Sequence, residues 1–251
     1  MAKENSSRLA FKSSRSKEKI HPWRLCPLGE HWVKEHALRV PPSKTHPVGT
    51  ITTRRGHCAK NPSGKDQLYF DEMQEIAERN FSKLTGAPTT NNLGFKYLGN
   101  RYDHLIRGWT QFWNEVFQPK EQLDPNLVKA LIASESSFDR NANGNAGKHN
   151  TARGLMQVTD QTLGILADED GELRDHLINL TQDQIYEPSA NIGAGIRWLF
   201  RKQETTSAKL KRNASWIETV ADYKSYLRHI AKNPRYRGMG IFMKYYDKLH
   251  Q

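Results

Sequence analysis

A helix start followed by an apolar stripe, at residues 124–138, constrains the fold most strongly. Asp124 offers a side-chain acceptor for an N-cap, and Pro125 suits the first helical position. Apolar residues then recur at helical spacing: Leu127, Val128, Leu131 and Ile132. Glu135 follows Leu131 by four positions, so we expect it to share the apolar side of this helix.

A carboxyl group on the apolar side of a helix has an unusual chemical environment. Loss of water disfavours its charged form, so we expect the pKa of Glu135 to be raised. A carboxyl that holds its proton near neutral pH is suited to general acid catalysis. The alternative is a helix-terminal glutamate that is solvated or held in a salt bridge.

Further helical patterns cover most of the remaining chain. They lie at residues 68–81, in the stripe Tyr102, Leu105, Ile106, Trp109, Phe112, Trp113 and Val116, at 188–202, at 213–231, and in the stripe Ile241, Phe242, Tyr245, Tyr246 and Leu249. We interpret the aromatic stripe as packing rather than as a platform for sugars. Strand signals are few, so the sequence predicts a mainly α fold.

Three short elements occur in a fixed order after residue 134. They are Glu135-Ser136-Ser137-Phe138, then Gly154-Leu155-Met156-Gln157, then Asn191-Ile192 with Gly195. Together they resemble the soluble lytic transglycosylases and goose-type lysozymes of glycoside hydrolase family 23, which cut the glycan strands of peptidoglycan. The resemblance covers residues 122–226 and implies a lysozyme-like catalytic domain.

The chain departs from that family in two places. The polar segment 139–152, rich in Asn and Gly, is longer than is usual in the family. The family also carries an Ala-Tyr-Asn element, whereas the matching place here reads Ala221-Asp222-Tyr223-Lys224. The tyrosine is kept and the asparagine is lost.

Cleavage of a glycosidic bond needs a proton for the leaving oxygen and stabilisation of the developing positive charge. Apart from Glu135, the acidic residues Asp139, Asp160 and Asp222 sit in polar or capping contexts, which favours solvated roles. A substrate with a 2-acetamido group can supply its own nucleophile, so one carboxyl can suffice. The resemblance implies that Glu135 protonates the leaving oxygen and then deprotonates the muramic acid 6-hydroxyl, which closes a 1,6-anhydro ring.

The resemblance also implies substrate-binding roles for several residues, each with an ordinary structural alternative. The candidates are Ser136, Gly154, Gln157, Asn191 and Tyr223. Ser136 could orient Glu135 or bond its own helix, and Gly154 could form a tight turn or be an ordinary loop glycine. Gln157 could bind sugar or brace its loop. Asn191 could be a helix cap, and Tyr223 an interior aromatic residue.

Charge divides the chain unevenly. Residues 1–66 hold 14 Lys and Arg against 5 Asp and Glu, so they supply +9 of the formal net charge of +11. We expect a flexible basic tail at 1–20, an irregular docking module at 21–66 and an α-helical domain at 67–251. The module contains Trp23 and Trp32, which suits docking. Residues 48–53 alternate like a short strand.

A cluster of potential metal ligands lies in the same module. It consists of Cys26, His31, His36, His57 and Cys58. The spacing matches no standard zinc finger, so we expect neither a metal nor another cofactor. One disulfide is possible, but synthesis in the cytosol favours thiols or a metal site.

The sequence also bears on location and partners. It has no long apolar run and no secretory signal, so we expect cytoplasmic synthesis and non-classical delivery to the periplasm or cell wall. A phage lysis system or a secretion machine could deliver it, with a partner or immunity protein bound to residues 21–66. The rival functions are plain hydrolysis, as in lysozyme, and non-catalytic binding of glycan or nucleic acid through the basic N-terminal region. Of these two ligands, we expect nucleic acid to be the less favoured.

Overall fold

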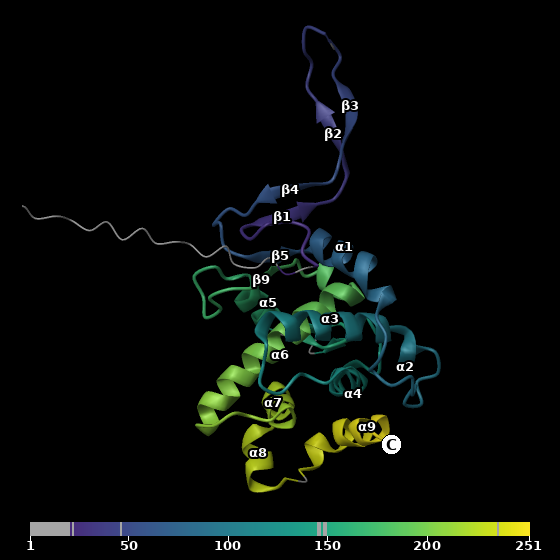
Figure 1. The fold of residues 1–251 in the computed structure, drawn as a ribbon, viewed down its shortest axis with the longest axis vertical. Helices are drawn as coiled ribbons and strands as arrows, with labels where there is room; N and C mark the ends of the chain where they lie inside the picture. Colours follow the sequence, from purple (N-terminus) through teal and green to yellow (C-terminus); the bar gives the residue numbers. More distant parts are fainter. Residues whose placement is uncertain (1–20, 22, 46, 145–146, 148–149, 235) are drawn as a thin grey trace, which may run out of the picture.

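The computed structural model describes residues 21–251 apart from 22, 46, 145–146, 148–149 and 235, and α-helices dominate it (Figure 1). The helices are α1 (Phe70–Asn80), α2 (Leu98–Arg101), α3 (Asp103–Phe117), α4 (Pro125–Ser136), α5 (Asp160–Ala167), α6 (Pro188–Leu210), α7 (Trp216–Tyr223), α8 (Leu227–Lys232) and α9 (Gly240–Leu249), with 3-10 helices at Phe81–Lys83, Gln184–Tyr186 and Arg237–Met239. The expected mainly α fold is confirmed. The expected flexible tail, residues 1–20, lies outside the described residues.

The strands are short and form small sheets. They are β1 (Glu30–Val33), β2 (His36–Val40), β3 (Thr50–Arg54), β4 (His57–Lys60), β5 (Gln67–Tyr69), β6 (Asn143–Gly144), β7 (Ala152–Arg153), β8 (Val158–Thr159) and β9 (Leu177–Asn179). Antiparallel pairing of β1 with β4 and of β2 with β3 builds a long hairpin that projects from the helical body (Figure 1). β5 runs parallel to β9, and β6, β7 and β8 form an antiparallel sheet.

Two tryptophans of α3 form the centre of the core. Trp109 and Trp113 are fully buried, and their indole nitrogens donate to Ser189 Oγ (3.0 Å) and to the Gly193 carbonyl (2.9 Å) on α6. Gly193 allows this close packing, because a Cβ there would lie 2.5 Å from Met73 Cε. The prediction that the aromatic stripe packs in the interior is confirmed.

A buried cation ties α4 to α3 and to the loop that precedes α2. The Lys129 side chain is 0 % exposed, and its ammonium donates to Asp103 Oδ2 (3.0 Å), Asn100 Oδ1 (2.9 Å) and the Thr89 carbonyl (2.7 Å). Burial raises the pKa of Asp103 and lowers the pKa of Lys129. Such a pair tolerates the loss of one partner poorly, because the remaining charge is left without compensation.

The N-terminal segment, residues 21–66, packs on the body through a second buried cation. Arg24 donates through Nε to Glu72 Oε1 and through Nη1 to Asp66 Oδ1, both at 2.6 Å. Glu72 lies in the first turn of α1 and is fully buried. Arg24 therefore links the N-terminal segment to the first helix of the body.

Both tryptophans of the N-terminal segment also face the body. The Trp23 ring lies against Phe81 and Phe112, with centroid distances of 5.7 and 6.2 Å. Trp32 lies beneath the guanidinium of Arg79 on α1, 5.8 Å from its ring centroid. These rings anchor the segment to its own chain, and the docking of an external partner on residues 21–66 stays a prediction.

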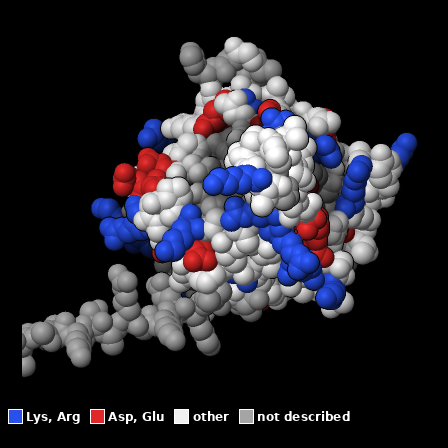
Figure 2. All heavy atoms as spheres, turned by 90° about the horizontal axis from the view of Figure 1, so that it is seen from above, with Lys and Arg blue, Asp and Glu red and all other residues white. Residues whose placement is uncertain are grey.

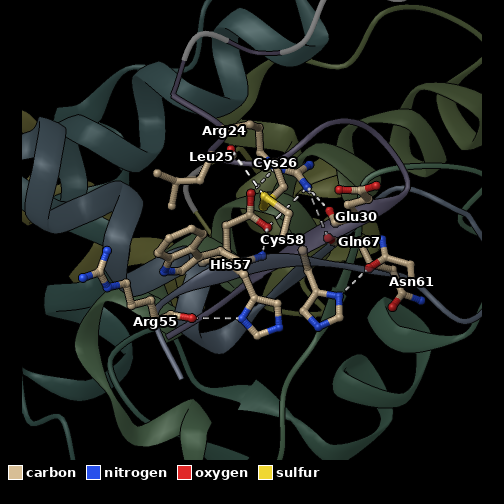
Figure 3. The surroundings of a disulfide bond; sticks show 12 residues. Arg24, Leu25, Cys26, Glu30, Arg55, His57, Cys58, Asn61 and Gln67 are labelled. Atoms are coloured by element: carbon tan, nitrogen blue, oxygen red, sulfur yellow. Dashed lines mark hydrogen bonds and ion pairs between the residues drawn. A yellow bond between two sulfur atoms is a disulfide. The ribbon is translucent and has the colours of Figure 1, made fainter. Parts of the chain in front are cut away.

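The two cysteines form a disulfide, which corrects the expectation of free thiols. Cys26 is bonded to Cys58 of β4 across 32 residues, close to His57 and Asn61 (Figure 3). Cysteines in a disulfide are not thiolate ligands. His31 bonds to Asn61, and the Nδ1 atoms of His36 and His57 lie 3.0 and 3.1 Å from nearby carbonyls. Within the described ranges, no three His, Cys, Asp or Glu residues form a metal-binding group.

Several predicted helix limits were wrong. Residues 67–69 form strand β5 before α1 begins, and the predicted helix 188–202 continues to Leu210. The helix expected at 213–231 is split into α7 and α8, because Ser225 adopts a positive φ of 64°. Ile241 of the last stripe is 61 % exposed. No helix in the described part of the chain has the length and apolar character needed to cross a membrane.

Candidate active site

Helix α4 places Glu135 at the edge of the core. The predicted start is confirmed, because Asp124 Oδ1 accepts a hydrogen bond from the Asn126 amide (2.8 Å) and Pro125 is the first helical residue. The apolar stripe, including Leu131 and Ile132, is buried. The Glu135 side chain is 18 % exposed. It is therefore largely shielded from water but still open to a ligand.

Lys224 is the closest charged neighbour of Glu135. Its Nζ lies 2.5 Å from Glu135 Oε1 and 3.3 Å from Ser134 Oγ, and its side chain is 12 % exposed. The sequence analysis gave a glutamate held in a salt bridge as its alternative, and the structure shows such a salt bridge, although the analysis did not identify Lys224 as the partner. Lys224 stands where the resembled family has asparagine, so its position could have been noticed, although its contact with Glu135 could not.

Tyr223 connects the acid to the glycine-containing turn. Its hydroxyl donates to the Met156 carbonyl (2.7 Å), and its ring packs against the core. Burial, with a smaller contribution from the charge of Glu135, raises the pKa of Tyr223. The hydroxyl therefore stays protonated and acts as a donor. The geometry brings Tyr223, Lys224 and Glu135 together. Tyr223 is the last residue of α7, and Lys224 is the C-cap of that helix.

The Gly154 turn is built by interior amide contacts. Gly154 has a positive φ of 72°, and a Cβ there would collide with the Asn191 amide. Asn191 is fully buried; it donates to the carbonyls of Arg153 (2.9 Å) and Ile185 (2.8 Å) and accepts from the Met156 amide (2.8 Å). Asn191 therefore braces this turn, and its candidate role in substrate binding stays a prediction. It is not a cap, because Glu187 caps α6.

Two other candidate contacts also serve the local structure. Gln157 Nε2 donates to the carbonyls of Gly154 (2.9 Å) and Ala142 (3.2 Å), which supports its bracing alternative. Ser136 Oγ donates to the Ile132 carbonyl one turn earlier (3.2 Å), so it bonds its own helix rather than Glu135. Ser134 is the serine that reaches the ion pair, and the sequence analysis did not select it.

The other acidic residues considered from sequence are engaged elsewhere. Asp222 is buried, against the expectation of a solvated role, and accepts hydrogen bonds from Thr206 Oγ1 (3.1 Å) and Lys209 Nζ (2.7 Å). Asp160 is ion-paired with Arg153, and Asp139 accepts from the amide two residues ahead. None of the three pairs with Glu135, which fits chemistry that uses a single carboxyl.

A cavity of about 550 Å³ lies away from this group, between the N-terminal segment and α3. His21, Asp66, Glu115 and His176 are among its lining residues, whereas Glu135 is not. His21 faces Glu115 at 3.2 Å and His176 faces Asp66 at 2.9 Å. Because neither Glu135 nor Tyr223 lines this cavity, it is not part of the candidate active site.

Comparison with known proteins identifies one family. The family model described as the transglycosylase SLT domain matches residues 113–243, which include α4, the Gly154 turn and α7. No curated protein and no solved structure matches the chain.

Proposed function

The chain belongs to the transglycosylase SLT domain family, and we propose that it cleaves the β-1,4 bond between MurNAc and GlcNAc in peptidoglycan by lytic transglycosylation. The observation that carries the proposal is the half-buried Glu135 at the end of α4, beside Tyr223 and within the matched residues. A carboxyl shielded from water, with a neutral hydroxyl nearby, is suited to moving protons in a glycosidic cleavage.

In the proposed reaction, Glu135 first gives a proton to the glycosidic oxygen, and that bond breaks. The 2-acetamido group of the sugar stabilises the positive charge at the anomeric carbon. Glu135, now a carboxylate, then takes the proton of the muramic acid 6-hydroxyl, and that oxygen bonds to the anomeric carbon. Glu135 ends the cycle protonated, and no water is consumed.

Lys224 adds a requirement to this cycle. Its Nζ lies 2.5 Å from Glu135 Oε1, the side-chain oxygen that has to be free to reach the glycosidic oxygen. We propose that the pair separates when the glycan enters. Lys224 then acts as a positioning residue that holds Glu135 in place before the glycan binds.

The disulfide supports an extracytoplasmic place of action. Disulfides persist in oxidising compartments such as the periplasm and are rare in the cytosol. The bond between Cys26 and Cys58 therefore fits a protein that works at the cell wall, where peptidoglycan lies. Delivery by a phage or by a secretion system, expected from the sequence, stays a prediction.

The mass of the product tests the proposed reaction. Purified sacculi digested with the protein should yield muropeptides that end in 1,6-anhydro-MurNAc, which are lighter by one water than hydrolytic products. Products with a free reducing end would instead assign the chain to hydrolysis, as in lysozyme. Tight binding to sacculi without any released fragment would indicate a non-catalytic glycan-binding protein.

A further inference from the structure

Figure 1 shows the projecting end of the hairpin standing clear of the helices over its described residues, 36–45 and 47–55. We call this segment the arm. β2 and β3 pair from His36 with Arg54 to Val40 with Thr50, and every residue of β3 is exposed. A two-stranded hairpin gains little stability by itself in water. Here β1, β4 and the Cys26–Cys58 disulfide fix the base of the arm. The arm is thus held out from the body at a defined place.

The charge of the arm has one sign. It contains Arg39, Lys44, Arg54 and Arg55 and no Asp or Glu. All four cations are exposed, and their side chains form no ion pair with a described residue. Viewed along the arm from its tip, Lys and Arg side chains spread around it (Figure 2). The register puts Arg54 on one face of the hairpin and Arg39 on the other, so both faces are basic.

The remaining side chains of the arm suit contact with a polar polymer. Thr50, Thr52 and Thr53 line β3 with exposed hydroxyl groups. Near the tip, Val48 and Ile51 are 95 % and 69 % exposed. Hydroxyls, guanidinium groups and small apolar surfaces together can bind carboxylates and the peptides that carry them.

We propose that the arm binds the carboxylates of peptidoglycan peptide stems and so holds the enzyme on its polymeric substrate. This inference rests on the proposed function, which places a polymer rich in carboxylates beside the protein. The arm lies at one end of the long axis of the molecule and α4 lies in the other half (Figure 1). It therefore binds a different part of the polymer from the bond that Glu135 cleaves, and acts as a tether.

The disulfide at its base favours the wall over nucleic acid as the anionic partner. A segment stabilised by Cys26–Cys58 is built for an oxidising compartment, where the wall is the abundant anionic polymer. The electrostatic attraction should weaken as salt is added, because exposed charges are screened. Simple adhesion by apolar groups would be much less sensitive to salt.

A sedimentation assay with insoluble sacculi tests the proposal. All proteins carry Glu135→Gln, so binding is measured without cleavage. The test variant replaces Arg39, Lys44, Arg54 and Arg55 by Gln. The control variant replaces four exposed lysines of the body, Lys83, Lys120, Lys232 and Lys244, by Gln and so loses the same charge. We expect the test variant to lose about tenfold in affinity, and the control to lose less than about twofold.

Chemical blocking of the sacculus identifies the ligand. Conversion of its carboxylates to neutral amides should reduce binding of the parent protein to the level of the arm variant. Equal affinity of test and control variants, or undiminished binding to blocked sacculi, would overturn the proposal. So would arm-dependent binding to duplex DNA or to anionic vesicles with none to sacculi. Circular dichroism and the absence of free thiols verify that the arm variant is folded.

Catalysis on two substrates separates this inference from the proposed function. With Glu135 intact, the arm variant should cleave short soluble glycan fragments at the parent rate and cleave sacculi with a raised KM. Equal KM values on sacculi would reject the tether and leave the proposed reaction untouched. If the parent protein cleaves neither substrate, the proposed reaction itself is rejected.

Discussion

The helical body and the arm use the same kind of side chain in opposite ways. In the body, Lys129 and Lys224 are shielded from water and paired with carboxylates. In the arm, Arg39 and Arg54 are exposed and lack such partners among the described residues. A cation of the first kind fixes the position of its neighbours, whereas one of the second kind is free to meet an external anion. Position in the fold, rather than residue type, decides what each cation does.

The largest difference should appear in stability. Lys129→Met leaves Asp103 buried without its cation and should lower the free energy of unfolding by about 3–5 kcal/mol. Lys44→Met in the arm should change it by less than about 0.5 kcal/mol. Urea denaturation followed by circular dichroism measures both. Adding Asp103→Leu to Lys129→Met should recover part of the loss. A Lys129 variant as stable as the Lys44 variant would remove the distinction between the two regions.

The disulfide should stabilise the N-terminal segment and not the helical core. Replacing Cys26 and Cys58 by Ser should cost about 3 kcal/mol, because a crosslink across 32 residues restricts the unfolded chain. Hydrogen exchange should show faster exchange in β1 to β4, with α3 and α4 still protected. Uniform loss of protection across both regions would mean that the segment and the body unfold together.

Cleavage by Lys224 variants tests the role of this lysine within the body. Lys224→Asn removes the ion pair that holds the Glu135 carboxyl group in place. The misplaced carboxyl group should lower kcat on short soluble glycan fragments by about tenfold, with a smaller change in KM. Lys224→Arg keeps the ion pair and should retain more of the parent kcat. Equal kcat values for all three proteins would exclude Lys224 from positioning Glu135.

The smallest effect concerns the capping box of α7, the helix that ends at Tyr223. A hydrogen bond from Arg212 lowers the pKa of Glu218 to about 2. A depressed carboxyl pKa stabilises the folded state above the ordinary value, and this contribution is lost as pH falls towards about 2. Glu218→Gln should therefore lower Tm slightly at about pH 6 and less at about pH 3. The pair is partly exposed, so the loss should be small. A difference in Tm between the parent and Glu218→Gln that grows as pH falls would contradict the expected direction of this pH dependence.

Local sequence patterns predicted many helices of the body but few of the contacts between side chains that are distant in the sequence. The start of α4 and the buried stripe of α3 each follow from neighbouring residues, and both were confirmed. The contact of Lys224 with Glu135 spans 89 positions, and that of Arg24 with Glu72 spans 48. Periodicity carries no information about contacts at such separations.

Only part of the candidate site could be predicted from the sequence. The position of Glu135 on the apolar side of α4 could be read from spacing, and the resemblance pointed to Tyr223. The role of Asn191 in bracing the Gly154 turn could not be predicted from the sequence. An amide that binds sugar and an amide that holds a buried turn look alike in sequence. The disulfide was not predicted either, because the cysteines were interpreted from the expected cellular compartment and not from their spacing.

The rate at which Glu135→Gln releases soluble muropeptides from sacculi tests the central claim most directly. Glutamine keeps the size of the side chain but neither donates nor accepts the required proton. The account predicts a fall of about 10³-fold with an unchanged circular dichroism spectrum and Tm. Release at the parent rate by the folded variant would contradict the claim that Glu135 moves the proton.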